Sequence, residues 1–230
     1  MDLLIFDLDG TLIDSRLDLA NAVNATRAHM GKEPLANERV YQYVGNGAPV
    51  LIRLAMGDGV TEAEFEEAFA YFMEYYGQHD LECTTLYPGV KESLDRLAAA
   101  GIRMAVLTNK PIAMSRAIVE GLGVSGHFFR VYGGNSFAVK KPDPTAVVAL
   151  MDEARTSRER TLIVGDSSVD VHTARNAGVA CCGVTYGFQP ESLENPAPDL
   201  KVDRMEEMVD WVLANGALQS SAPTTTNPAQ

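Results

Sequence analysis

Short, uninterrupted apolar runs recur along this chain and alternate with segments of helical character. The first run, residues 3–6, leads directly into carboxylates and a glycine, which is typical of a strand buried on both faces of a parallel sheet. Similar runs lie at 102–107, 128–132, 161–164 and 179–184, with helical patterns at 90–100, 111–120, 144–154 and 169–177. Strands alternating with helices predict an α/β fold with a Rossmann-like parallel sheet and right-handed crossovers.

Residues 15–80 interrupt this alternation, because they contain several helical patterns and no convincing strand. The last pattern opens with Thr61 and Glu64 in the spacing of a capping box, and aromatic residues between 65 and 76 share one face. A module of helices is therefore expected within the α/β chain, directly after its first strand.

The expected domain division follows from these patterns. Residues 1–14 and 81–216 form an α/β catalytic core, and residues 15–80 form a helical insert. Residues 217–230 are mainly Ser, Thr, Pro, Ala and other small or polar residues, a composition that predicts a disordered tail.

The charge balance and the cysteines exclude several classes of protein. With 31 acidic and 19 basic residues, the net charge is −12 and the isoelectric point is near 4.7, so a basic nucleic-acid-binding surface is not expected. No apolar stretch approaches the roughly 18 residues of a membrane helix, and no basic region precedes the first apolar run, as it would in a signal peptide. Three cysteines without Cys-x-x-Cys spacing favour buried thiols in a reducing cytoplasm. A cytoplasmic monomer or homodimer is expected, without nucleic-acid or membrane partners.

Two carboxylates, Asp7 and Asp9, follow the first predicted strand and precede Gly10. A chain that leaves the sheet at a glycine can aim both side chains into one crevice. Burial and mutual repulsion raise the pKa of at least one such carboxyl group, which separates their roles into nucleophile or metal ligand and general acid and base. The alternative interpretation is an Asp-Gly pair that only caps a turn.

Polar residues follow two further predicted strands. Asp166 ends the strand at 161–164, and Asp170 lies one turn into the next helix. Oxygen ligands without His or Cys nearby suit a hard cation such as Mg²⁺. Thr108 and Asn109 follow the strand at 102–107 and open a helix, where a hydroxyl and amides can bind an anion.

Lys141 precedes Pro142 in a polar loop and can neutralise a phosphoryl oxygen. A single lysine is more often a solvated surface charge. The catalytic interpretation is favoured here because all of these elements lie at the carboxyl ends of parallel strands, where open α/β folds bind ligands.

In order and spacing, these residues resemble the four motifs of the haloacid dehalogenase superfamily: Asp7-x-Asp9-Gly-Thr, Thr108, Lys141-Pro142 and Gly165-Asp166-x-x-x-Asp170. The helical insert resembles that superfamily's small α-helical cap. The resemblance implies the superfamily's Rossmann-like core fold and Mg²⁺-dependent phosphoryl chemistry, because the dehalogenases and the phosphonate-cleaving members lack an acid at the position of Asp9.

The resemblance implies a role for each catalytic residue. Asp7 would be the nucleophile, forming an aspartyl-phosphate and binding Mg²⁺. Asp9 would protonate the leaving group, then deprotonate the attacking water, and its backbone carbonyl would bind the metal. Lys141 would steady the nucleophile and the phosphate.

The same resemblance implies binding roles. Thr108 and the amide of Asn109 would hold the phosphoryl oxygens. Asp166 would be a direct metal ligand, and Asp170 would act through water or through its neighbours.

Finer matches resemble the phosphoglycolate phosphatase group. They are Thr108-Asn109-Lys110, the loop at 133–142 and the segment at 185–188. Asn135 departs from this pattern, since the group usually has Asp there, and so does Phe137-Ala138 in place of Leu-Pro. These departures bear on the substrate, for which 2-phosphoglycolate is the prediction, and not on the chemistry.

In the helical insert, Gly45, Asn46 and Gly47 resemble the group's loop that faces the active site, which implies contact with the substrate. Arg53, one turn into the next helix, is a candidate bidentate partner for a substrate carboxylate, although an arginine at such a place is more often a surface residue.

Alternative functions stay open at this point. A phosphosugar mutase like β-phosphoglucomutase, or a pyrophosphatase or nucleotidase, would share the catalytic residues, and a non-catalytic sensor of phosphometabolites would need no nucleophile. The insert is expected to open and close through linkers near residue 14 and residues 84–88, excluding water during phosphoryl transfer.

Overall fold

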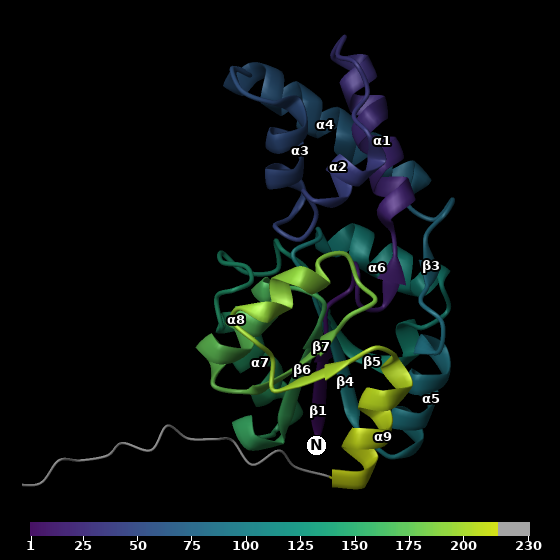
Figure 1. The fold of residues 1–230 in the computed structure, drawn as a ribbon, viewed down its shortest axis with the longest axis vertical. Coiled ribbons are helices and arrows are strands. Elements are labelled where there is room, and N and C mark those ends of the chain that lie inside the picture. The colour runs from purple at the N-terminus through teal and green to yellow at the C-terminus, as the bar shows by residue number, and fades with distance from the viewer. Residues whose placement is uncertain (216–230) are drawn as a thin grey trace, which may run out of the picture.

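Within residues 1–215, which the computed structural model describes, the centre of the molecule is a sheet of six parallel strands. In spatial order they are β5 (Phe128–Tyr132), β4 (Arg103–Leu107), β1 (Leu3–Phe6), β6 (Thr161–Gly165), β7 (Ala180–Val184) and β8 (Leu200–Val202). The predicted α/β class and Rossmann-like parallel sheet are confirmed (Figure 1).

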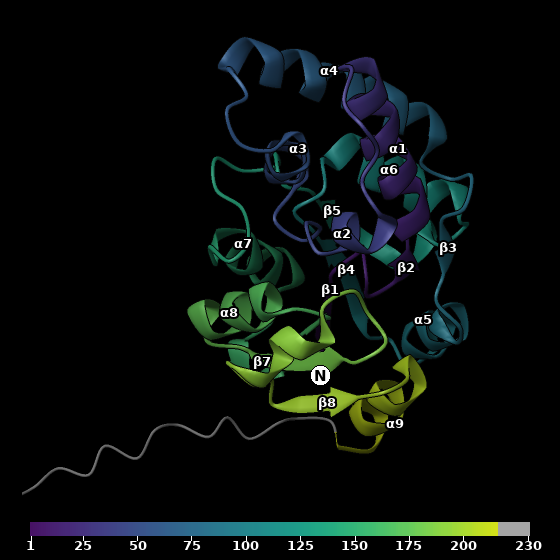
Figure 2. The same cartoon turned by 45° about the horizontal axis from the view of Figure 1, so that its top comes forward.

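Helices cover both faces of this sheet (Figure 2). They are α5 (Val90–Ala99), α6 (Ile112–Gly121), α7 (Thr145–Ala154), α8 (Ser168–Ala177) and α9 (Met205–Asn215), with 3₁₀ turns η1 (Ser125–His127), η2 (Arg158–Arg160) and η3 (Pro190–Glu194). Leu4 and Phe6 of β1 pack with residues of α5, α6 and α9, whereas Leu3 and Ile5 pack with α7 and α8. Side chains alternate between the faces of a strand, so two covered faces require the continuous apolar run that the sequence shows.

The helices of the insert lie beyond the carboxyl ends of the strands (Figure 1). They are α1 (Arg16–His29), α2 (Asn37–Tyr41), α3 (Ala48–Met56) and α4 (Glu62–His79). Their apolar faces form a second hydrophobic cluster, which includes the buried Phe72 and Tyr76 and is joined by Met114 of α6. The predicted capping box opens α4, because the Thr61 hydroxyl accepts from the Glu64 amide and the Glu64 carboxylate accepts from the Thr61 amide.

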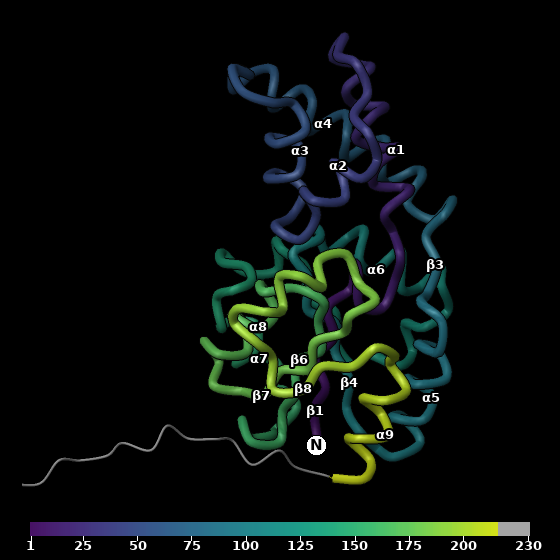
Figure 3. Tube along the Cα trace, in the orientation of Figure 1, coloured from purple at the N-terminus to yellow at the C-terminus, as the bar shows by residue number. Residues whose placement is uncertain are grey.

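The two segments that join the insert to the core form a short antiparallel ribbon (Figure 3). Strand β2 (Ile13–Asp14) pairs with β3 (Thr85–Leu86). The buried carboxylate of Asp18 accepts hydrogen bonds from the backbone amides of Cys83 and Thr84, at 2.8 to 3.0 Å. The sequence predicts linkers here and no strand pairing, because a strand of two residues is too short to show a period.

Strand β8 and helix α9 were also absent from the sequence-based expectation. Strand β8 has only three residues. Helix α9 buries Met205, Met208, Val209 and Val212. Their spacing is that of an amphipathic helix, so the sequence was sufficient to predict it. The tail predicted for 217–230 lies outside the described residues. Among the helices of residues 1–215, none has both the length and the apolar character that a bilayer span requires.

Candidate active site

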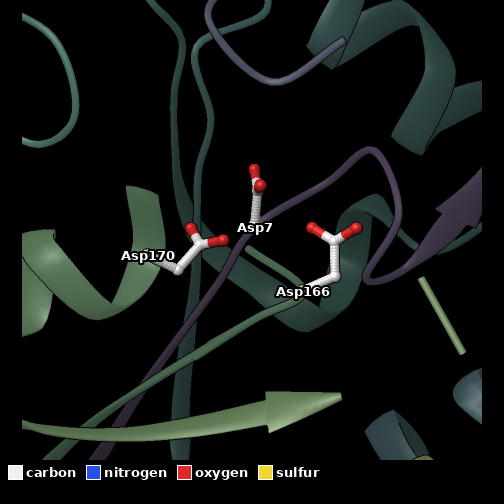
Figure 4. A group of neighbouring side chains, drawn as sticks. All are labelled: Asp7, Asp166 and Asp170. Carbon is white, nitrogen blue, oxygen red and sulfur yellow. The ribbon is translucent and has the colours of Figure 1, made fainter. Parts of the chain in front are cut away.

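The carboxyl ends of three neighbouring strands bring the predicted motifs together. Strand β1 lies between β4 and β6 in the sheet. Asp7, Thr108 and Asp166 directly follow these three strands, so they lie at the same end of the sheet. The backbone amide of Asp7 donates to the Val164 carbonyl at 2.9 Å, which extends the strand pairing up to the site. Asp170 comes from the first turn of α8. Figure 4 shows the carboxylates of Asp7, Asp166 and Asp170 turned toward a common space.

These three aspartates form a buried acidic cluster. Each offers a carboxylate oxygen within 4.8 Å of the others, and the three residues are at most 9% exposed. Burial raises the pKa of Asp7 to about 6; Lys141 opposes the rise and the charge of Asp170 adds to it. Burial, with the charges of Asp170 and Asp7, also holds the pKa of Asp166 well above its usual value. The cluster is therefore short of positive charge.

Lys141 supplies one buried cation to this cluster. Its Nζ lies 2.9 Å from Asp7 Oδ1 and 2.7 Å from Asp170 Oδ1, and its side chain is 3% exposed. Burial alone would lower the pKa of Lys141, but Asp170 and Asp7 raise it above the usual lysine value. Lys141 is thus charged at neutral pH and lies against the predicted nucleophile.

The remaining oxygens of the cluster distinguish its members as metal ligands. Both carboxylate oxygens of Asp170 already accept hydrogen bonds. Oδ1 accepts from Lys141, and Oδ2 accepts from the amide and hydroxyl of Ser167. Among the hydrogen bonds of residues 1–215, none reaches Asp7 Oδ2 or Asp166 Oδ1. Two free carboxylate oxygens, in a site with excess negative charge, fit a hard cation such as Mg²⁺. Asp7 and Asp166 are the residues that could hold it directly.

Glycines keep the space around Asp166 open. Gly10 has a φ of +84°, and a Cβ on it would lie 2.2 Å from Asp166 Oδ2. A Cβ on Gly187 would lie 2.2 Å from the Cβ of Asp166. The next amide, that of Phe188, donates to Asp166 Oδ2 at 2.6 Å. The segment at 185–188, to which the sequence alone assigns no role, therefore orients a candidate metal ligand.

Replacing Asp166 by Asn is expected to stabilise the metal-free protein at neutral pH while removing its response to Mg²⁺. The substitution takes one charge from a buried cluster that lacks cations and keeps an acceptor for the Phe188 amide, so the free energy of unfolding should rise. Thermal unfolding in EDTA and in excess Mg²⁺ measures both effects. An equal Mg²⁺-induced rise in Tm for the variant and the wild type would exclude Asp166 as a ligand.

Asp9 lies beside the cluster and has partners of its own. Its Oδ1 accepts from the Ser15 hydroxyl at 2.5 Å and from Lys110 Nζ at 3.0 Å. Lys110 Nζ also donates to the Tyr76 hydroxyl of α4 at 2.7 Å. Neither residue is among the site residues predicted from the sequence, where Lys110 is only part of a family match and Tyr76 lies on the apolar face of a helix. The lysine next to Thr108-Asn109 was the only signal, since the tyrosine's contact depends on where the insert lies.

Asn109 joins three segments around the site. Its side-chain amide donates to the Gly45 carbonyl at 3.1 Å and to the Lys141 carbonyl at 3.2 Å. The Thr108 hydroxyl accepts from the Lys110 amide at 3.2 Å. Both Thr108 and Asn109 are buried and line the pocket between insert and core.

The predicted loop of the insert reaches the same pocket. Gly45 and Gly47 line it; a Cβ on Gly47, whose φ is +87°, would lie 2.9 Å from the Asn109 carbonyl oxygen. Asn46 meets the core through its carbonyl, which accepts from Lys140 Nζ at 2.6 Å. The loop therefore contacts the core mainly through its backbone.

Arg53 is the candidate that the structure does not bring to the site. Its guanidinium pairs with Glu62 at 2.7 Å and lies 3.9 Å from the ring centroid of Phe65. Its side chain is 52% exposed, and it is absent from the residues that line the pocket. Here Arg53 contacts partners on α4 at the outer surface, and its binding of a substrate carboxylate stays a prediction.

Comparison with known proteins agrees with the motifs. Residues 4–184 match the haloacid dehalogenase-like hydrolase family. The phosphoglycolate phosphatase of Pseudomonas putida is 40% identical over 214 residues, 90% of this chain and 78% of the relative. That of Vibrio parahaemolyticus is 39% identical over 219 residues, 91% and 95% of the two chains.

A solved structure supports the same assignment. The crystal structure of a predicted phosphoglycolate phosphatase from Haemophilus somnus is 33% identical, with a TM-score of 0.86 over 91% of this chain and 97% of that one. The resemblance inferred from the motifs is therefore confirmed. This chain belongs to the haloacid dehalogenase-like hydrolase family, and the relatives that it matches over nine tenths of its length are phosphatases.

Proposed function

We propose that this protein is a Mg²⁺-dependent phosphatase that hydrolyses 2-phosphoglycolate. The observation that carries the proposal is the buried cluster of Asp7, Asp166 and Asp170 with Lys141 against the nucleophile. The relatives named phosphoglycolate phosphatase, at about 40% identity, support the choice of substrate. The net charge of −12 does not oppose an anionic substrate, because the site itself would hold Lys141 and a divalent cation.

In the proposed reaction, Asp7 and Asp9 act in turn. A carboxylate oxygen of Asp7 forms a bond to phosphorus while the bond from phosphorus to the ester oxygen breaks. Asp9 gives its proton to that oxygen, which releases glycolate and leaves an aspartyl-phosphate on Asp7. Asp9 then takes a proton from the water that attacks phosphorus, and phosphate leaves. Positioning and charge stabilisation supply most of the rate in such transfers.

The neighbouring residues hold charge and geometry for these steps. Bound at Asp7 and Asp166, and at the backbone carbonyl of Asp9, Mg²⁺ would supply positive charge that stabilises the transferring phosphoryl group. Lys141, which contacts Asp7 at 2.9 Å, would neutralise a phosphoryl oxygen. Asp170 positions Lys141 through its 2.7 Å contact, and we assign it this role rather than direct metal ligation.

Thr108 and the amide of Asn109 complete the phosphoryl-binding side of the proposed site. Residues 15–80 act as a cap over a core of residues 1–14 and 81–216. Apolar cap residues such as Leu19, Leu51 and Phe72 line the pocket and exclude water from the reaction. The ribbon of β2 and β3 would be the hinge of cap opening.

A screen of phosphate esters tests the proposal. Purified protein with Mg²⁺ is expected to release phosphate from 2-phosphoglycolate faster than from sugar phosphates, nucleotides or pyrophosphate, and EDTA should stop the release. Asp7→Asn is the matched control for contaminating phosphatases. Conversion of β-glucose 1-phosphate to the 6-phosphate, with little free phosphate, would replace this function by a mutase. No turnover of any ester would refute the phosphatase. The cytoplasmic location and the monomer or homodimer state stay predictions.

A further inference from the structure

The pocket contains a cation that the chemistry described above does not use. Among residues 1–215, Lys110 is the only basic side chain that lines it. The Lys110 side chain is 5% exposed, and apolar residues of the same pocket, Phe72 and Met114 among them, surround the site. A buried ammonium group needs an anion or strong acceptors.

An ammonium group has three N–H donors, and the described residues give Lys110 Nζ two hydrogen-bond partners. Nζ lies 3.0 Å from Asp9 Oδ1, 2.7 Å from Tyr76 Oη and 4.5 Å from the centroid of the Tyr76 ring. The Tyr76 oxygen accepts from Lys110, so its own hydroxyl proton is uncommitted within the described hydrogen bonds. Burial raises the pKa of Tyr76 above its usual value, so that proton is present at neutral pH. Lys110 and Tyr76 together offer an ammonium and a hydroxyl donor on one side of Asp9.

This position corresponds to a defined part of the proposed substrate. Asp9 is the group assigned to the ester oxygen, and in 2-phosphoglycolate the carboxylate is one methylene away from that oxygen. A donor within hydrogen-bond distance of Asp9 is therefore a close neighbour of the substrate carboxylate once Asp9 contacts the ester oxygen. Arg53, the other candidate for this role, is held outside the pocket by Glu62.

We propose that Lys110 and Tyr76 form the subsite that binds the carboxylate of the substrate, and that they select phosphate monoesters with a carboxylate one carbon from the ester oxygen. The proposal rests on the proposed function of the same site. Because Lys110 belongs to the core and Tyr76 to α4 of the cap, the subsite is complete only when the cap lies over the core. Carboxylate binding and cap closure would then favour each other.

The test compares two esters that differ at this position: 2-phosphoglycolate and 2-hydroxyethyl phosphate, which carries a hydroxymethyl group in place of the carboxylate. Lys110→Met should raise KM for 2-phosphoglycolate about 10- to 100-fold, as expected for a lost charge-assisted bond. KM for 2-hydroxyethyl phosphate should change less than about threefold. Tyr76→Phe, which keeps the ring, should also raise KM for 2-phosphoglycolate and not for 2-hydroxyethyl phosphate, by a smaller factor than Lys110→Met does. Lys91→Met, on an exposed lysine of α5 paired with Asp95, is the matched control.

Equal losses with both esters would overturn the proposal, because they would show that Lys110 acts by positioning Asp9 for any substrate. Unchanged KM values would overturn it as well. Titration calorimetry in the Asp7→Asn background separates this proposal from the proposed function. Even if the wild type has no phosphatase activity, Lys110→Met must weaken the binding of 2-phosphoglycolate and leave that of 2-hydroxyethyl phosphate unchanged. The subsite would be refuted if the protein with Lys110 bound both esters equally, or bound neither.

Discussion

Replacing Asp7 by Asn is expected to abolish turnover and, in the absence of metal, to give a protein that is more stable than the wild type at neutral pH. The amide cannot form the aspartyl-phosphate, so kcat should fall by about 10⁴-fold or more. In the folded protein the pKa of Asp7 is about 6, against 3.8 for an ordinary aspartate. A carboxyl group with a raised pKa stabilises the fold below pH 4, and this contribution is lost as pH rises through 6.

The pH dependence of unfolding measures this effect directly. Between pH 3 and pH 7 the wild type without metal should lose about 3 kcal/mol of unfolding free energy relative to Asp7→Asn. Urea titrations in EDTA at several pH values give the difference curve. Mg²⁺ should restore the unfolding free energy that the wild type loses. It should stabilise the variant less, because an amide is a poorer metal ligand than a carboxylate. A flat difference curve would contradict the burial of an ionised Asp7.

Replacing Lys141 by Met is expected to have the opposite effect on stability. The ammonium contacts Asp7 at 2.9 Å and Asp170 at 2.7 Å, and its loss leaves buried carboxylates without a cation. Breaking a buried pair in this way costs about 3–5 kcal/mol. Activity should fall about 100- to 1,000-fold as well, because one group that stabilises the phosphoryl charge is missing.

Urea titration in EDTA measures the cost of Lys141→Met, and a second substitution identifies its cause. Asp170→Asn in the Lys141→Met background removes one of the stranded charges and should recover part of the stability, without recovering activity. The exposed Lys91→Met variant should match the wild type. If Lys141→Met unfolds at the wild-type urea concentration, the lysine is not the essential counter-ion of the cluster.

The parts of this site that lie at strand ends were predictable from the sequence, and the reason is geometric. Asp7, Thr108 and Asp166 each follow an apolar run, and the carboxyl ends of parallel strands must meet at one edge. The position of each residue directly after an apolar run was therefore enough to predict that the three residues lie close together in the fold. The catalytic interpretation needed only the order of these motifs.

The parts that join cap and core could not be predicted in the same way. Tyr76 has the helical spacing of a core residue, and nothing in its neighbourhood indicates that its hydroxyl meets Lys110. The position of Arg53 outside the pocket could not be predicted either, because it depends on the pairing with Glu62, nine residues further along the chain. In each case the partner is set by how two elements pack and not by the pattern within either of them.

The pairing of Ile13 with Leu86 has a consequence for how such a protein can change. The segment between these residues leaves and re-enters the core at one point. It is therefore attached to the core in the same way as the loop of a β-hairpin. A segment of different length or composition could be exchanged there without moving any strand of the sheet. Asp7, Asp166 and Lys141 would stay in place, while Tyr76 and the apolar wall of the pocket would be replaced together. Such an exchange would leave the proposed catalytic aspartates on the core, and the proposed carboxylate subsite would keep Lys110 but lose its partner Tyr76.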